Sequence, residues 1–322
     1  MTPNQVRMAN PILGSLMLAG AVQSPMAAQA LFPRLPVALR GFQLASLGDA
    51  ATRAYNTRRA PGAATKQVKI SWQGQTYTVA QHAIDVPIPR ELIQEADEAR
   101  RLNVGANAAI SQIAVNTALQ ILNLDYELEA AAIATDATPY ASNTRTYDNS
   151  SGKYKWSHAS GTPVSDIAAA ANTIRSGTGR RPNTLLVSAV AFGALQLNKE
   201  VQSYLTGAGG VKGPATMEQL KAILKVSNIV VGEAIWTNEA GTTDDVWGNN
   251  AILAYVPPIG PEGTGLALGE PAYGFTSWMD GHPMVETPYY QRETKSWIYG
   301  ATFERTPTLV RAGAGFLFKN PN

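Results

Sequence analysis

Apolar and polar residues alternate between residues 66 and 80, which is the spacing of a half-buried β-strand. One face collects the apolar residues Val68, Ile70, Trp72, Tyr77 and Val79, with lysine, serine and threonine between them. Gln73-Gly74 interrupts the alternation, and glycine tolerates the positive φ of a two-residue turn. The pattern predicts a β-hairpin over 66–80 that turns at Gly74. Because a two-stranded ribbon is marginal alone, it must pack on a third strand or on a neighbouring molecule.

A helical period replaces the alternation beyond residue 88. Residues 88–104 begin with Pro89, carry acidic residues early and Arg100 and Arg101 late, and predict a short helix. Residues 106–134 predict a second helix about 43 Å long, at 1.5 Å per residue. Its expected buried stripe comprises Ile110, Ile113, Ile121, Leu124 and Leu128. Because it lacks the repeated charges of a coiled coil, we expect it to lie on a sheet.

Helices alternate with short apolar strands between residues 156 and 280. We expect helices over 163–175, 189–198 and 216–226, and strands over 184–188, 229–235 and 251–256. This order predicts a compact α/β lobe. Three further strand-like runs follow at 296–303, 308–311 and 314–318. We expect these strands to pack next to the long helix.

The start of the chain has no regular period. Residues 31–60 predict an extended arm, which has little means of burying itself and should lie along a partner. An earlier apolar run, Ile12–Val22, is followed by Ala28-Gln29-Ala30 and so resembles a secretory signal with its cleavage site. The run is shorter than the about 20 residues that span a bilayer, and glycine and serine dilute it. We therefore expect an arm and no export.

Composition narrows the possible functions. The 322 residues include no cysteine, which excludes disulfides, thiolate catalysis and thiolate metal sites and makes a cytoplasmic protein the simplest interpretation. The net charge is +2, yet residues 1–90 carry 9 Lys and Arg against 2 Asp and Glu, and residues 91–322 carry 17 against 22. The basic front could contact DNA or an acidic partner through its charge, or it could be a solvated extension.

The residues that most often perform chemistry do not cluster in the sequence. His82, His158 and His282 lie far apart, and none has a second ligand at metal-site spacing. Asp244 and Asp245 are adjacent and would point to opposite sides of a strand, so we expect them to be solvated. The six tryptophans are scattered, as core or interface anchors are. The sequence therefore predicts no catalytic set, no metal site and no cofactor.

A glycine-rich stretch over 207–214 superficially resembles a phosphate-binding loop. It fails on spacing, because Val211 precedes Lys212 and Gly213 follows it, whereas a P-loop has glycine before the lysine and Ser or Thr after it. We expect a flexible loop at the tip of the α/β lobe.

Several short runs recur in a characteristic order along the chain. They are Leu31-Phe32-Pro33 with Pro36-Val37, the alternating stretch 66–80, the Ala/Ile/Leu-rich helix, Arg181–Ser188, Thr216–Val226, Ile229–Ala234, Trp247-Gly248, Leu253–Pro257 and Gly315–Asn320. In this order they resemble the major capsid proteins of tailed bacteriophages over about residues 31–320.

The resemblance implies an α+β, Hong Kong 97-type capsid fold. Its parts would be an N-terminal arm (1–60), an extended β-hairpin loop (61–88), a peripheral domain with a long spine helix (89–155 and 281–322), and an α/β axial domain (156–280).

It also implies a coat protein, not an enzyme, that assembles into pentamers and hexamers of an icosahedral shell around double-stranded phage DNA. Contacts with neighbouring copies would be Val68, Lys69, Ile70, Trp72, Gly74, Tyr77 and Val79 in the extended loop, Leu31, Phe32, Pro33 and Pro36 in the arm, and Gly207, Gly209, Gly210 and Lys212 in the axial loop. A separate scaffolding protein and a portal would be partners, with non-specific contact to DNA and no membrane. Assembly would take place in the host cytoplasm, and the product would be the virion. Some members form lysine–asparagine crosslinks, for which Lys66 or Lys69 would be the donor.

Two alternatives remain at this point. An encapsulin-type nanocompartment would have the same fold and enclose an enzyme, and it would show a cargo groove on its inner face. A soluble α/β enzyme or sugar-binding protein would be a small oligomer with a deep polar pocket. A secreted binding protein would in addition need the signal-like N-terminus to be cleaved.

Overall fold

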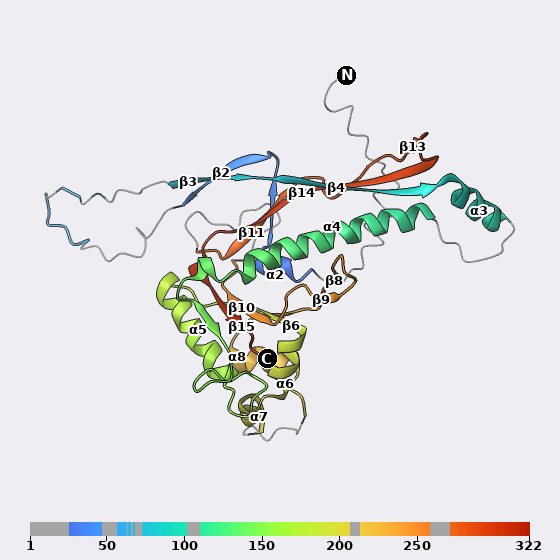
Figure 1. The fold of residues 1–322 in the computed structure, drawn as a ribbon. Helices are drawn as coiled ribbons and strands as arrows, with labels where there is room; N and C mark the ends of the chain where they lie inside the picture. The colour runs from blue at the N-terminus through green and yellow to red at the C-terminus, as the bar shows by residue number, and fades with distance from the viewer. Residues whose placement is uncertain are drawn as a thin grey trace.

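The computed structural model describes residues 26–46, 57–62, 64–65, 67, 73–101, 110–206, 213–257 and 271–322. An upper layer of long strands lies on a long helix, α4 (Ile110–Thr135), and a lobe of short strands and helices lies below that helix (Figure 1). The described residues therefore form two large sheets, with α4 and the N-terminal segment between them, and two separate pairs of strands.

The upper layer is a six-stranded sheet organised around β14 (Ser296–Leu309). Along β1-β11-β14-β12 each strand pairs with the next, and β13 and β4 pair with β14 as well. The bounds of these partners are Arg34–Val37 for β1, Ala80–Pro89 for β4, Gly274–Met279 for β11, Met284–Val285 for β12 and Tyr289–Gln291 for β13. β4 runs antiparallel to β14 from Ser296 opposite Pro89 to Arg305 opposite Ala80. The predicted runs 296–303 and 308–311 thus belong largely to one strand, and α3 (Arg90–Arg101) follows β4 directly.

The long helix lies against this sheet as predicted, but it does so on a different face. Its 26 residues are about 39 Å long at 1.5 Å per residue. The buried side chains are mostly small and include Ala114, Val115, Ala118, Leu119, Leu122, Ala130 and Ala131. Ile113 and Ile121, members of the predicted stripe, are 53% and 42% exposed. The prediction was wrong because it chose the largest apolar residues, whereas alanines let the helix approach the strands closely.

A buried arginine joins α4 to the sheet. Arg305 of β14 is fully buried, and its guanidinium pairs with Asp125 at 2.7 Å and with Glu129, both on α4. The same guanidinium lies 4.8 Å from the ring centre of Tyr126. His82 of β4 adds a contact of 2.9 Å to Asp125. Because a buried charge is costly without partners, the cluster fixes one position of the helix on the strands.

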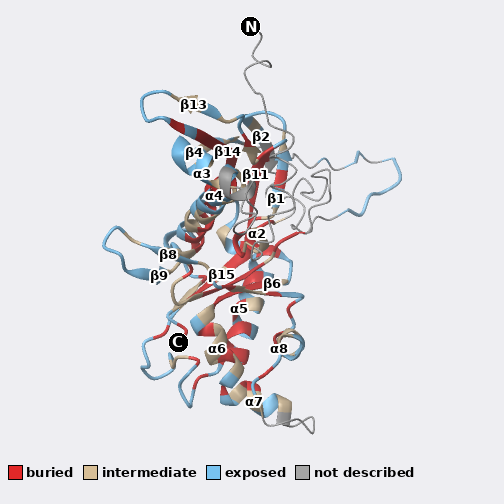
Figure 2. Ribbon diagram, turned by 90° about the vertical axis from the view of Figure 1, so that its right-hand side faces the viewer, coloured by how far each residue is buried: buried red, intermediate tan, exposed pale blue. Residues whose placement is uncertain are grey.

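The lobe contains a five-stranded sheet in the order β5-β15-β10-β6-β7. Its strands are β5 (Thr144–Thr146), β6 (Thr184–Ser188), β7 (Asn228–Gly232), β10 (Asn250–Ala254) and β15 (Gly315–Lys319), and its helices are α5 (Pro163–Thr178), α6 (Ala189–Leu197), α7 (Lys199–Thr206) and α8 (Met217–Leu224). A separate hairpin, formed by β8 (Ile235–Thr237) and β9 (Thr243–Asp245), connects β7 with β10. Short 3₁₀ turns complete the chain at Thr138–Tyr140 and Ala312–Ala314. The red strands and helix faces in Figure 2 show the core of this lobe.

Helix boundaries in the lobe follow from local signals. Pro163 occupies the first turn of α5, and Gly179 ends that helix with a φ of 74°. The hydroxyl of Ser188 caps the first turn of α6. Thr216 and Gln219 cap α8 reciprocally, through side-chain bonds of 3.4 and 2.9 Å to each other's N–H groups. Such signals explain why these helices could be placed from sequence.

The two sheets do not divide where the sequence suggested. β15 was expected to return to the long helix, but it pairs with β10 inside the lobe, and β5 pairs with β15. β11, which falls within the predicted axial domain, pairs with β14 in the upper sheet. The predicted boundaries near 155 and 280 therefore assign β5, β11 and β15 to the wrong layer.

Candidate assembly surfaces

A two-stranded ribbon leaves the upper layer toward one side. It consists of β2 (Gly41–Ser46) and β3 (Gln73–Thr78), which pair antiparallel from Gly41 opposite Thr78 to Ser46 opposite Gln73. We call this pair of strands the extended ribbon. Between these two strands in the sequence, the structure describes residues 57–62, 64, 65 and 67. All of them are exposed, and they lie at the far left of Figure 1.

The base of the extended ribbon is fixed by one ion pair and a group of aromatic rings. Arg40 donates two hydrogen bonds, of 2.9 and 2.7 Å, to the carboxylate of Glu304, whose side chain is 1% exposed. The Phe42 and Tyr77 rings stack at 5.7 Å, and Tyr77 meets the edge of Phe275 in the upper sheet at 5.2 Å. Partial burial raises the pKa of the Tyr77 hydroxyl. These contacts attach the base of the extended ribbon to the upper sheet.

The predicted hairpin over 66–80 is wrong in its pairing. Gly74 lies inside β3 opposite Ala45, not at a turn, and Tyr77 faces Phe42. Val79 donates its N–H to the carbonyl of Arg40 at 2.8 Å, beyond the end of the strand pair. The predicted contacts Val68, Lys69, Ile70 and Trp72 lie outside the described residues. Alternation shows that a stretch is a strand, but it does not identify the partner strand, which here comes from the predicted arm.

The N-terminal segment, residues 26–37, is built into the subunit. It forms α2 (Ala28–Leu31) and β1, and β1 pairs parallel with β11. Leu31 and Phe32 are fully buried, so the expectation that they contact neighbouring copies is wrong. Pro33 is half-buried and Pro36 is exposed, and their contact with a neighbour stays a prediction.

A buried carboxylate ties this segment to both layers. Glu127 of α4 accepts hydrogen bonds from the N–H of Ala28 at 3.1 Å and from the indole of Trp247 at 3.0 Å. Its side chain is 4% exposed, and burial raises the pKa of the Glu127 carboxyl. Phe32 packs on Tyr273 in the same cluster, with ring centres 5.5 Å apart. No sequence signal identified Glu127, because it is one of three acidic residues in this part of α4 and acidic residues on a helix usually face solvent.

In the sequence, the predicted axial loop lies between α7 and α8. Gly207, Gly209, Gly210 and Lys212 lie outside the described residues. The described chain on either side belongs to the lobe, with α7 before the loop and α8 after it. α7 lies at the lower tip of the lobe in Figure 1, and the contact of the predicted axial loop with neighbouring copies stays a prediction.

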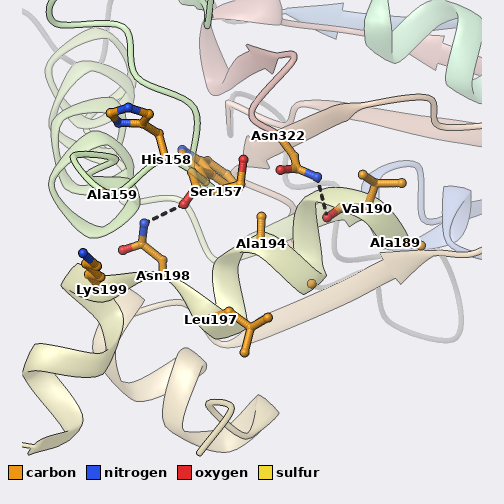
Figure 3. A pocket seen from close by; sticks show the side chains of 12 residues that line it. Ser157, His158, Ala159, Ala189, Val190, Ala194, Leu197, Asn198, Lys199 and Asn322 are labelled. Carbon is orange, nitrogen blue, oxygen red and sulfur yellow. Dashed lines mark hydrogen bonds between the residues drawn. The ribbon is translucent and has the colours of Figure 1, made fainter. Parts of the chain in front are cut away.

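A cavity of about 560 Å³ opens on the lobe beside α6 (Figure 3). Among the described residues no carboxylate lines it, and Asn198 donates its amide to the carbonyls of Trp156 and Gly161 at 2.7 and 3.1 Å. His158 stacks on Tyr154 at 4.6 Å between ring centres. The polar groups of the wall therefore serve the local backbone, and the cavity lacks the convergent groups of an active site.

Charged groups elsewhere in the described residues form structural pairs. Asp166 accepts a hydrogen bond of 2.7 Å from Tyr147 and pairs with Arg145 at 2.9 Å, and burial raises the pKa of its carboxyl. His282 lies in the loop between β11 and β12, where it is buried, and its ring lies 3.7 Å from Glu304. In the described ranges no three His, Cys, Asp or Glu side chains are grouped as metal ligands.

No helix in the described part of the chain combines the length and apolar character needed to cross a membrane.

Comparison with known proteins decides the family. No protein-family model matches the chain. A phage-related protein from Bordetella bronchiseptica RB50, known from its crystal structure, is 32% identical, with 98% of both chains covered and a TM-score of 0.75. The major capsid protein of Burkholderia phage BcepMu is 29% identical over 320 residues, 99% of this chain and 98% of that protein. This chain belongs to the phage major capsid protein family.

Membership of the capsid family explains the fold, and it explains why the described residues show no grouped catalytic or metal-binding side chains. The capsid structure of Cyanophage P-SCSP1u is 12% identical, with coverage of 90% and 86% and a TM-score of 0.52, and so shares the fold alone. The predicted α+β capsid fold is confirmed. The relatives are structural proteins, so the chain is a shell protein and not an enzyme. The encapsulin alternative shares this fold, but the identity along the whole chain is to a phage capsid protein.

Proposed function

We propose that this chain is the coat subunit of an icosahedral shell, built from pentamers and hexamers, that encloses a double-stranded DNA phage genome. Membership of the capsid family supports self-assembly into a shell and residence in the virion. In this proposal each subunit lays its extended ribbon on a neighbouring subunit.

The extended ribbon carries the proposal. Two strands by themselves are marginally stable in water, and the described residues beyond them are exposed. A neighbouring subunit would supply the surface that the ribbon lacks within its own chain. Many such contacts, each weak, add up when a symmetric shell closes.

Further partners follow from the same reasoning. Arg58 and Arg59 are exposed beside the extended ribbon, so they could meet DNA phosphates or acidic groups of a neighbour. We propose a separate scaffolding protein and a portal as partners, assembly in the host cytoplasm, and the loop around Lys212 as a contact at the symmetry axis.

The test replaces the loop between β2 and β3. Ser46 and Gln73 face each other at the end of the strand pair, so an Asn-Gly turn can replace residues 47–72 and leave both strands intact. Electron microscopy of the purified full chain should show closed shells, and the shortened chain should give folded subunits that fail to form stable shells. A control, Ala60→Ser at an exposed position, should assemble normally. Shells of normal yield from the shortened chain would refute the proposal that the part of the chain between β2 and β3 lies on a neighbouring subunit.

A further inference from the structure

The β8–β9 hairpin projects from the lobe and presents an acidic and apolar surface. Ile235 faces Asp245 and Trp236 faces Asp244 across the two strands, and Thr242 closes the turn by donating its N–H to Asn238 at 2.9 Å. Ile235 is 58% exposed, which is unusual for a large apolar side chain. Figure 2 shows the hairpin as a pale blue projection away from the red core.

The charge of this hairpin has one sign. Residues 233–247 contain Glu233, Glu239, Asp244 and Asp245 and no lysine or arginine. Glu233, Glu239 and Asp244 are exposed, and Asp245 is half-buried. Acidic groups that surround an exposed isoleucine favour a partner surface that is basic and partly apolar.

A basic edge lies on the other side of the same lobe. Its exposed cations are Arg175, Arg180, Arg181, Lys225 and Arg311. They come together because Ser227 donates its N–H to the carbonyl of Asn183 at 3.0 Å, and Arg311 donates to the carbonyl of Gly177 at 3.1 Å. The stretches 170–183, 225–228 and 308–313 contain no Asp or Glu. We call these five cations the arginine edge.

The two surfaces lie on opposite sides of one subunit. In Figure 1 α5, which carries Arg175 in its last turn, forms the left side of the lobe, and β8 and β9 project on the right. A patch on one side that matches a patch on the other produces a head-to-tail contact, and such contacts close into rings when the rotation is right. An isologous contact would instead need one patch to match itself.

We propose that the β8–β9 hairpin of one subunit docks on the arginine edge of the next copy, and that this contact repeats around each pentamer and hexamer. The inference rests on the proposed shell function and names a contact that holds the ring together. Charge complementarity within one chain favours a second copy as the occupant, because the same polypeptide supplies an acidic surface on one side of the lobe and a basic surface on the other. Single exposed ion pairs contribute little, but here several act together and recur at every interface.

Charge reversal tests the contact directly. One variant carries Arg175→Glu, Arg180→Glu and Arg181→Glu, and a second carries Glu233→Lys, Glu239→Lys and Asp244→Lys. Each alone should raise the subunit concentration needed for assembly at least about tenfold, and the combined variant should return to within about threefold of the unsubstituted chain. Circular dichroism and thermal unfolding establish that each variant is folded.

The controls separate the inference from the proposed function. Lys153→Glu and Glu218→Lys reverse exposed charges of the lobe outside both surfaces and should leave assembly unchanged. If the unsubstituted chain forms shells and both triple variants do so at the same concentration, the inference fails and the shell function stands. Normal shells with reduced DNA content in the arginine variant would assign that edge to DNA and overturn the inference.

Cysteine crosslinking gives a second measurement that does not need complete shells. The chain has no cysteine, so Ala240→Cys in the hairpin turn and Ser176→Cys at the arginine edge introduce the sole thiols. A short bis-maleimide should join copies of the double variant into a ladder that ends at five or six subunits. Neither single variant should form it. Absence of the ladder in the double variant, or the same ladder in a single variant, would refute the docking.

Discussion

The N-terminal segment and the extended ribbon are close in sequence and end in opposite environments. Both were expected to lie on neighbouring subunits, the arm because it has no regular period and the hairpin because two strands are marginally stable alone. The segment fills the space between α4 and the lobe, with Leu31 and Phe32 fully buried. The described loop residues beyond the ribbon are exposed.

The difference comes from the size of the side chains. Residues 26–32 contain Met26, Leu31 and Phe32 with alanines between them, which is enough to fill a gap between two layers. The described residues 57–62 contain only alanine and proline as apolar residues. A short aperiodic segment can therefore join the core of its own subunit when it carries two or three large apolar groups.

Removing the ring of Phe32 should have the largest effect. Phe32→Ala should lower the free energy of unfolding by about 3–5 kcal/mol, because a fully buried aromatic ring is replaced by a cavity. Leu39→Ala, at a side chain that is 70% exposed in the same part of the chain, should change it by less than about 0.5 kcal/mol. Urea denaturation of both variants measures the contrast. Equal losses would mean that the segment is not part of the core.

The ion pair at the base of the ribbon should have an intermediate effect. Arg40→Ala removes both hydrogen bonds to buried Glu304, so the β2 and β3 amides should exchange hydrogen roughly tenfold faster, and those of α4 should not. Hydrogen–deuterium exchange with mass spectrometry reads both regions at once. Arg292→Ala, at an exposed position near β13, is the control. Unchanged exchange in the ribbon would show that its aromatic contacts suffice.

The smallest expected effect is a pH dependence of the N-terminal segment. Burial raises the pKa of Glu127 in the folded chain, so the folded state keeps this proton to a higher pH than the unfolded state. Stability from this group is therefore greatest below its ordinary pKa of 4.5 and falls as pH rises through the folded pKa. Glu127→Gln removes the titration, so its unfolding free energy relative to the unsubstituted chain should rise as the pH increases above about 4.5. A constant difference would contradict the assignment.

Local signals made much of the lobe predictable. The strand 184–188 has the predicted bounds, and the helices that begin near Pro163, Ser188 and Thr216 differ by a few residues at most. Each of these is marked by a proline, a capping residue or a short apolar run, and such marks act through bonds to near neighbours. The length of α4 was predictable for the same reason.

The pairing of distant segments was not predictable. The partner of β3 is about thirty residues upstream, and the partner of β15 is in the middle of the lobe. The partners of Glu127 are Ala28, 99 residues before it, and Trp247, 120 residues after it. Such contacts depend on which surfaces fit together in space. The alternation of a strand or the period of a helix is compatible with many partners, so it does not identify the right one. The prediction of the buried face of α4 failed for a related reason. Alanine is only weakly apolar, yet its small side chain lets the helix pack closest to the strands.

The burial of α2 also bears on cleavage near the start of the chain. The bond after Ala30 lies inside this helix, next to the fully buried Leu31, so a protease reaches it more easily when the helix leaves its place. Cleavage there would remove the N–H group of Ala28 that donates to Glu127. A subunit that begins at Leu31 would therefore lack this contact between the N-terminal segment and α4.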